Sequence, residues 1–95
     1  IINPQKISGA VSCYFEIETS PDTLAQVTET LRRNETITQI YRVTGKNKLH
    51  VHAVAASGEE MEQLIEEVID PLPGVLSSSC NMILSRIKDI KGLRL

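Results

Sequence analysis

The 95-residue sequence predicts an α+β domain whose elements follow the order β-α-β-β-α-β. Residues 39–55 carry two runs rich in Ile, Tyr, Val and Thr around a turn at residues 44–48, where Gly45 and Asn47 tolerate positive φ. A strand-like run and a helix-like run precede this hairpin, and a helix-like run and a strand-like run follow it. This is the ferredoxin-like order, for which we expect a four-stranded antiparallel sheet with two helices on one face.

The first strand is expected over residues 9–19, where apolar and polar side chains alternate. Its apolar side consists of Val11, Cys13, Phe15 and Ile17. Ser20-Pro21-Asp22 predicts the start of the first helix, because serine accepts from free amides, proline fits the first helical position, and aspartate complements the dipole. The apolar stripe of this helix is Leu24, Val27 and Leu31, with Ala25 and Thr28 beside it. We expect Asn34 to end the helix in the left-handed conformation.

The second helix has a stronger start signal, since Ser57 and Glu60 have the spacing of a capping box. Asp70-Pro71 ends it, and its apolar face is formed by Met61, Leu64, Ile65, Val68 and Ile69. The acidic residues of this helix fall mainly on its other side, which indicates a solvated face rather than a metal site. Residues 71–75 predict a rigid turn into a last strand over residues 75–88.

Composition limits what this chain can bind. A net charge of -2, a pI near 5.6 and 3% aromatic residues offer neither a basic surface for a phosphate backbone nor a stacking platform for bases. No apolar run is long enough to span a bilayer. The two cysteines, Cys13 and Cys80, lack metal-ligand spacing, so we expect buried, reduced thiols in a cytoplasmic protein.

We expect one domain over residues 1–95, a length that suits a single core. Because the chain begins without Met, residues 1–8 are predicted to be a linker from a missing N-terminal domain, and residues 89–95 a C-terminal tail.

The sequence contains no nucleophile elbow, no phosphate-binding glycine loop and no paired carboxylates outside the acidic helix face. We therefore expect no enzyme activity and no cofactor. A dimeric ferredoxin-like barrel enzyme is the alternative in that class, and it would need a roomy cleft with convergent polar groups between sheet and helices.

The sheet face opposite the helices is predicted to be mixed in character. It is expected to carry Tyr14, Ile40, Arg42, His50, His52 and Val54. Such a face indicates a homodimer in which two sheets pack together about a twofold axis. His50 and His52 could hold zinc or copper with a third ligand, but none is evident, so we expect interface residues and no metal site. Protonation of this pair would alter association at mildly acidic pH.

The order of several short motifs supports a resemblance to a known family. Arg42-Val43-Thr44-Gly45 is followed by two variable positions and a strand, then by the capped helix, and then by Leu72-Pro73-Gly74-Val75. A strand closing in Ile-Lys and a Gly-Leu-x-Leu tail complete the pattern. The fragment resembles the effector domain of the Lrp/AsnC (feast/famine) transcriptional regulators, and Asn3-Pro4-Gln5-Lys6 resembles the segment that follows their helix-turn-helix domain.

This resemblance implies a homodimer, with tetramer or octamer rings of dimers, and DNA binding only through the missing N-terminal domain. It also implies a small effector, usually an amino acid, held between dimers by Gly45, Asn47, Lys48, Ser78 and Cys80. Many family members have Tyr-Asp where this chain has Asn47-Lys48, and Thr where it has Cys80. The sequence therefore favours an anionic ligand, a carboxylate without an amine, or no ligand. A stand-alone module that binds a metabolite without DNA is the alternative.

Overall fold

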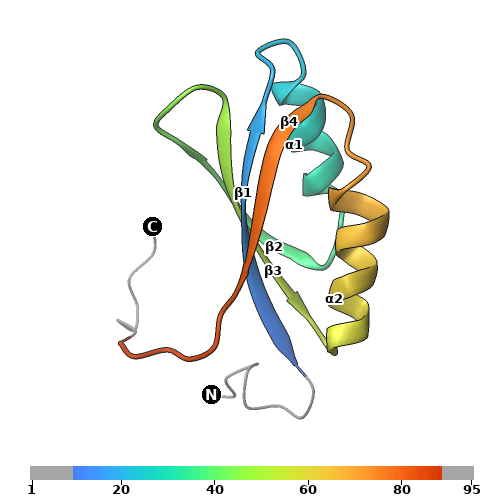
Figure 1. Cartoon of the computed structure of the whole chain (residues 1–95), viewed down its shortest axis with the longest axis vertical. Coiled ribbons are helices and arrows are strands. Elements are labelled where there is room, and N and C mark those ends of the chain that lie inside the picture. The colour runs from blue at the N-terminus through green and yellow to red at the C-terminus, as the bar shows by residue number, and fades with distance from the viewer. Residues whose placement is uncertain (1–9, 89–95) are drawn as a thin grey trace.

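The structure is a computed structural model that describes residues 10–88, so the predicted linker over residues 1–8 and tail over residues 89–95 lie outside the described residues. Its elements are β1 (Val11–Thr19), α1 (Leu24–Arg32), β2 (Ile37–Val43), β3 (Lys48–Ala55), α2 (Gly58–Leu64), a π-helical continuation η2 (Ile65–Ile69) and β4 (Val75–Met82). The strands form one antiparallel sheet in the order β2-β3-β1-β4, and Figure 1 shows both helices on one side of it. The predicted βαββαβ order and ferredoxin-like α+β fold are confirmed.

The core lies between the helices and the inner strands β1 and β3. Phe15 and Val51, which are paired across these strands, are both 0% exposed. The helices cover them with Val27 and Leu31 from α1 and with Met61 from α2. The alternation predicted for β1 is confirmed, because Cys13, Phe15 and Ile17 are buried beneath the helices. The residues between them therefore project from the other side of the sheet, which we call the open face.

The first helix begins at Leu24 instead of at Ser20. Ser20 does not cap it, because the Ser20 hydroxyl hydrogen-bonds the Thr23 hydroxyl at 2.7 Å and the Thr23 N–H donates to the Ser20 carbonyl at 3.2 Å. Asn34 is also not left-handed: its side-chain oxygen accepts from the Thr36 N–H at 2.9 Å. Within residues 10–88, Asn47 is the one non-glycine residue with positive φ. At both predicted ends of this helix, the side chains of Ser20 and Asn34 form local hydrogen bonds instead of the predicted cap.

The second helix starts as predicted. The Glu60 N–H donates to the Ser57 hydroxyl oxygen at 3.2 Å, and the Glu60 carboxylate accepts from the Ala56 N–H at 3.1 Å. The helix then widens into η2, where the Asp70 N–H donates to the Ile65 carbonyl at 2.8 Å. The apolar face still reaches the core, since Met61, Leu64 and Ile69 are buried.

The strand β2 has the opposite facing to the one predicted. Ile40 is paired with Val51 and Arg42 with Leu49, and both partners are buried beneath the helices. The prediction that Ile40 and Arg42 share a face with the histidines is therefore wrong. Tyr41 and Gln39, paired with His50 and His52, take those positions. Residues 40 and 41 both have bulky side chains, so the alternation in the sequence does not show which of them faces the helices. The register shift between Ile37 and Gln39 decides this, because it pairs residue 40 with Val51.

The strand β4 ends at Met82 instead of at residue 88. The Ile83 N–H still donates to the Ser12 carbonyl at 2.8 Å, after which the chain leaves the sheet. Leu84 and Ile87, which follow, are 86% and 97% exposed. The predicted strand was too long because apolar residues continue in the sequence after Met82, the last residue of β4 that pairs with β1.

Candidate functional site

The hairpin turn between β2 and β3 has the backbone conformation that its sequence predicts. Gly45 has a φ of 116° and Asn47 a φ of 50°, both in the left-handed region. The Asn47 carbonyl accepts from the Thr19 N–H at 3.0 Å, which holds the base of the turn against the end of β1. The turn thereby places Lys48, the first residue of β3, beside β1.

Two of the five implied ligand-binding residues line one hollow. Lys48 and Ser78 border a hollow of about 320 Å³ between β1, β3 and β4. The rest of its lining is Glu16, Ile17, Glu18, Ser77 and Ser79. Gly45, Asn47 and Cys80 do not line it. Ser78 and Cys80 are paired with Ile17 and Phe15, on the helix side of the sheet, whereas Lys48 projects from the open face. The five residues therefore do not form a single site within one chain.

The hollow also contains two carboxylates, Glu16 and Glu18, that were not among the predicted site residues. Lys48 is directly opposite Glu18, and Glu18 is directly opposite Ser77, so the three side chains form one row across the open face. The Ser77 hydroxyl donates to Glu18 Oε1 over a long 3.5 Å contact. The alternation of β1, combined with its antiparallel partners, is the signal that could have located Glu18. The hollow thus presents a cation and a carboxylate side by side.

The next rows of the open face hold an aromatic and histidine cluster, made of Tyr14, Glu16, Tyr41, His50 and His52. His50 Nδ1 is hydrogen-bonded to the Glu16 carboxylate. His50 Nε2 lies 2.8 Å from His52 Nε2, and the two ring centroids are 4.7 Å apart. The rings of Tyr14 and Tyr41 lie beside His50, with centroid distances of 5.2 and 6.3 Å. We call these five residues the histidine cluster.

Burial and charge act together on His52. Partial burial lowers its pKa, and a positive charge on His50 lowers it further, while Glu16 opposes the change. Its imidazole therefore stays neutral to a lower pH than an ordinary histidine. Within residues 10–88, no group of three or more His, Cys, Asp or Glu side chains is arranged to hold a metal ion.

The two cysteines differ in environment. Cys13 is 2% exposed, as predicted, but Cys80 is exposed on the edge strand β4, so the prediction of burial is wrong for Cys80. Burial, reinforced by the neighbouring Cys80, raises the pKa of the Cys13 thiol to about 11. Cys13 is therefore protonated and unreactive at neutral pH. Both residues are free thiols.

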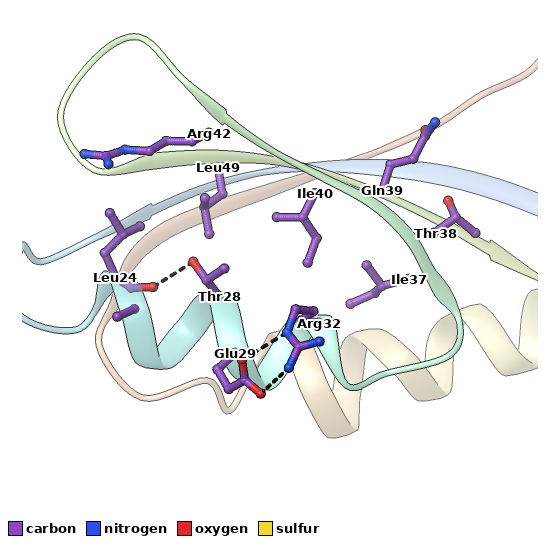
Figure 2. Close-up of a pocket in the computed structure, with 11 residues that line it drawn as sticks. Leu24, Thr28, Glu29, Arg32, Ile37, Thr38, Gln39, Ile40, Arg42 and Leu49 are labelled. Carbon is purple, nitrogen blue, oxygen red and sulfur yellow. Dashed lines mark hydrogen bonds and ion pairs between the residues drawn. The ribbon is translucent and has the colours of Figure 1, made fainter. Parts of the chain in front are cut away.

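A larger groove separates α1 from β2 (Figure 2). It encloses about 720 Å³, and its wall includes the apolar side chains of Leu24, Ile37, Ile40 and Leu49. Small residues of α1, Ala25 and Thr28, lie opposite β2 and leave this space unfilled.

Three polar side chains that line this groove, those of Thr28, Glu29 and Arg32, already form hydrogen bonds. Arg32 Nη2 lies 2.8 Å from Glu29 Oε2 at the mouth, and the Thr28 hydroxyl donates to the Leu24 carbonyl at 2.8 Å. Hydrogen bonding from Arg32 lowers the pKa of Glu29, which keeps this carboxylate ionised. The lining includes no histidine, cysteine or aspartate. The groove thus has the room that the barrel-enzyme alternative needs.

Comparison with known proteins identifies the family. The family model described as the Lrp/AsnC ligand binding domain matches residues 12–93. The chain belongs to the Lrp/AsnC family. It is 28% identical over 87 residues to the helix-turn-helix-type transcriptional regulator LrpA of Pyrococcus abyssi, and 26% identical to LrpA of Pyrococcus horikoshii. Each match covers 92% of this chain and 62% of the relative, so this Lrp/AsnC chain spans less than two thirds of the length of these regulators.

Solved structures of the family have the same fold. Escherichia coli AsnC superposes with a TM-score of 0.81 at 15% identity, covering 95% of this chain and 61% of that one. A transcriptional regulator from Neisseria meningitidis, solved as a complex with L-Met, gives a TM-score of 0.82 at 12% identity, covering 99% and 62%. The match to FFRP-DM1 has a TM-score of 0.73 at 22% identity and covers 78% of this chain and 99% of that one.

No helix in the part of the chain that the structure describes has the length and apolar character of a membrane span.

Proposed function

We propose that this chain is the effector-binding and assembly module of an Lrp/AsnC-type transcriptional regulator that acts in the cytoplasm. The observation that carries the proposal is the row formed by Lys48, Glu18 and Ser77 at the hollow on the open face. DNA binding would belong to a further domain of the full protein, as the longer helix-turn-helix relatives suggest.

The effector is an amino acid rather than a simple anion. The Lys48 ammonium can pair with the ligand's carboxylate, and the Glu18 carboxylate with its ammonium group. The hydroxyls of Ser77 and Ser79 supply further hydrogen bonds beside them. The Neisseria meningitidis relative in complex with L-Met supports this ligand class. Glu18 thus takes the role of the acidic side chain that the resemblance implies for many family members at position 48, and the preference for anions expected from Lys48 alone does not follow.

The module assembles through the open face. Both helices lie on the other side of the sheet, and the open face carries Tyr14, Tyr41 and Val54, all partly buried, among polar groups. A second copy turned about a twofold axis would cover these side chains. Because the hollow opens on the same face, a ligand bound there lies beside the interface.

Regulation follows from this position. An effector that contacts Lys48 and Glu18 shifts the balance between two assemblies only to the extent that it binds one of them more tightly. A change in packing between copies would then reposition the DNA-binding domains.

Thermal unfolding with a panel of amino acids and the matching 2-oxo acids tests the ligand site. A ligand at 100 times its dissociation constant should stabilise the fold by about 2.7 kcal/mol, which raises the melting temperature of a domain this small by several degrees. We expect amino acids to produce this rise and the 2-oxo acids, which lack the ammonium group, to produce much less.

Three variants test whether the rise in melting temperature comes from ligand binding at the hollow. Lys48→Gln and Glu18→Gln should each abolish the shift, whereas Lys46→Gln, which removes a lysine from the same hairpin outside the hollow, should retain it. A larger rise in melting temperature from 2-oxo acids than from amino acids would show that Glu18 does not bind the ligand's ammonium group. No rise from any compound, with the oligomer confirmed, would leave assembly as the function.

A stand-alone module that binds a metabolite without DNA is the second candidate. The observation in its favour is the match that covers 99% of the FFRP-DM1 chain, which leaves no room there for a DNA-binding domain of its own. The length of the native polypeptide, measured by immunoblot of the source organism, separates the two candidates. A band near the 10.5 kDa of this chain would favour the stand-alone module.

A further inference from the structure

We propose that His50 and His52 from two copies of this chain bind one divalent transition-metal ion, with Zn²⁺ as its reference occupant, at the centre of the open-face dimer. The inference rests on the proposed dimer and adds to it a metal site, next to the effector hollow, that shares Glu16 with that hollow.

The two imidazoles already converge. Histidines two residues apart on a strand project from the same face, and the Nε2 atoms of His50 and His52 lie 2.8 Å apart. Two nitrogens bound to tetrahedral zinc at the usual bond length are separated by about 3.3 Å. To bind one ion, the two Nε2 atoms need to move apart by about half an ångström, and both rings need to turn so that their lone pairs meet at the ion, which lies off the line joining the nitrogens.

The surroundings of His50 prepare it as a ligand. The Glu16 carboxylate accepts the Nδ1 proton of His50, which fixes the tautomer and leaves the Nε2 lone pair available. A carboxylate on the far nitrogen is the usual partner of a metal-bound histidine, because it orients the ring and raises its basicity. Before metal arrives, His52 Nε2–H donates to His50 Nε2. On binding, His52 takes the other tautomer, with its proton on Nδ1, so no change of net charge is required.

The remaining contacts limit alternative conformations. The Tyr14 ring lies 5.2 Å from the His50 ring and 6.2 Å from the His52 ring, and the Tyr41 ring meets His52 edge-on. Both imidazoles are also partly buried within the cluster. These features give a partly desolvated pair of nitrogen donors of the kind that zinc and copper prefer.

A second copy is needed because one chain supplies half of a tetrahedral shell. The described residues contain no third His, Cys, Asp or Glu placed to complete it. His50 and His52 lie on β3, an inner strand of the sheet, so the pair sits near the middle of the open face. Packed sheets lie about 10 Å apart, and a histidine side chain reaches about half of that distance. A twofold axis through this region brings two pairs together as four nitrogen ligands, and two Glu16 carboxylates balance the charge of the ion.

Titration of the purified chain with Zn²⁺, followed by calorimetry and sedimentation equilibrium, tests the site. We expect one zinc ion per two chains and a tighter dimer in its presence. The Co²⁺-substituted protein should show the visible absorption of a tetrahedral site. His50→Gln and His52→Gln should each weaken zinc binding at least 100-fold, and Glu16→Gln, which removes the carboxylate that orients His50 and also lines the effector hollow, should weaken it by about 10- to 100-fold. Tyr41→Phe, which keeps the ring, should bind as the parent does.

The outcomes separate the metal site from the dimer. A chain that dimerises but binds no zinc would overturn the metal site and leave the open-face dimer standing. A monomer that binds no zinc would overturn both. One zinc ion per chain, or binding that survives both histidine substitutions, would contradict a site shared between copies. Circular dichroism of each variant confirms that it has folded before its affinity is compared.

Discussion

The two faces of the sheet differ in what their residues do, although the same strands build both. On β1, Phe15 and Ile17 face the helices and are almost completely buried, while Glu16 and Glu18, one position away, line the hollow on the open face. The helix side has a satisfied core: the described residues contain no buried side-chain nitrogen or oxygen without a hydrogen-bond partner. The open face instead carries a lysine, two glutamates and two histidines in adjacent rows. The comparison teaches that one strand can hold the fold together with one side and form a binding surface with the other.

The largest expected difference between the faces is in stability. Phe15→Ala removes a side chain that is 0% exposed and should lower the free energy of unfolding by about 3–5 kcal/mol. Tyr14→Ala, the neighbouring position on the open face, should cost the monomer much less, because its ring is only half-buried. Urea denaturation at a concentration that keeps both variants monomeric measures the pair. Equal losses in the free energy of unfolding would show that the two faces contribute equally to the stability of the monomer.

A second test concerns the turn that leads into β4 on the helix side. A Cβ atom at Gly74 would lie 2.4 Å from Thr23 Cβ, and Gly74 has a φ of 86°. Gly74→Ala should therefore destabilise the domain by about 1–3 kcal/mol, through strain and a steric clash. Gly58→Ala is the matched control, because nothing lies within 4 Å of its added methyl group. Thermal unfolding should rank the control at or above the parent protein; a stable Gly74→Ala variant would mean that the turn readily relaxes.

Substitutions at the starts of the two helices should change the stability of the domain by a smaller amount. Ser57→Ala removes the hydroxyl that accepts the Glu60 N–H and should cost about 1 kcal/mol. Ser20→Ala, at the position that resembles a cap in sequence but does not cap the observed helix, should cost less. Chemical denaturation of both variants measures the difference. A larger loss at Ser20 would place the start of α1 where the sequence predicted it.

The smallest expected effect is the pH dependence contributed by the open face. The pKa of His52 is lowered in the folded chain, so the unfolded chain binds more protons as the pH falls below the ordinary histidine value of about 6.5. The free energy of unfolding should decrease from there and level off below the folded pKa. His52→Gln should remove this part of the slope when monomer stability is measured between pH 8 and 5. An unchanged slope would show that His52 titrates normally.

The sequence was sufficient for the fold because its strongest signals are local. The alternation in β1, the left-handed residues Gly45 and Asn47, and the capping pair Ser57 and Glu60 each follow from nearby residues, and all are confirmed. The family resemblance is also confirmed.

The errors arose where one side chain's role depends on a distant partner. Ser20 forms a bond with Thr23, which also bonds the Gly74 carbonyl across the fold, so the serine pattern alone misplaces the helix start. Ile40 and Tyr41 both suit a buried position, and only the register with β3 decides which one faces the helices. Glu18 entered the candidate site through its pairing with Lys48, a contact between strands that neither strand's sequence reveals alone.

The most direct test of the account is a titration of the ¹⁵N-labelled chain with the amino acid that gives the largest thermal shift. We predict that the amide signals of Glu18, Lys48 and residues 77–79 move first and most, and that Lys48→Gln removes these changes. Signals that move instead at Leu24, Thr28 and Ile40 would place the ligand in the groove between α1 and β2 and would contradict the open-face effector site.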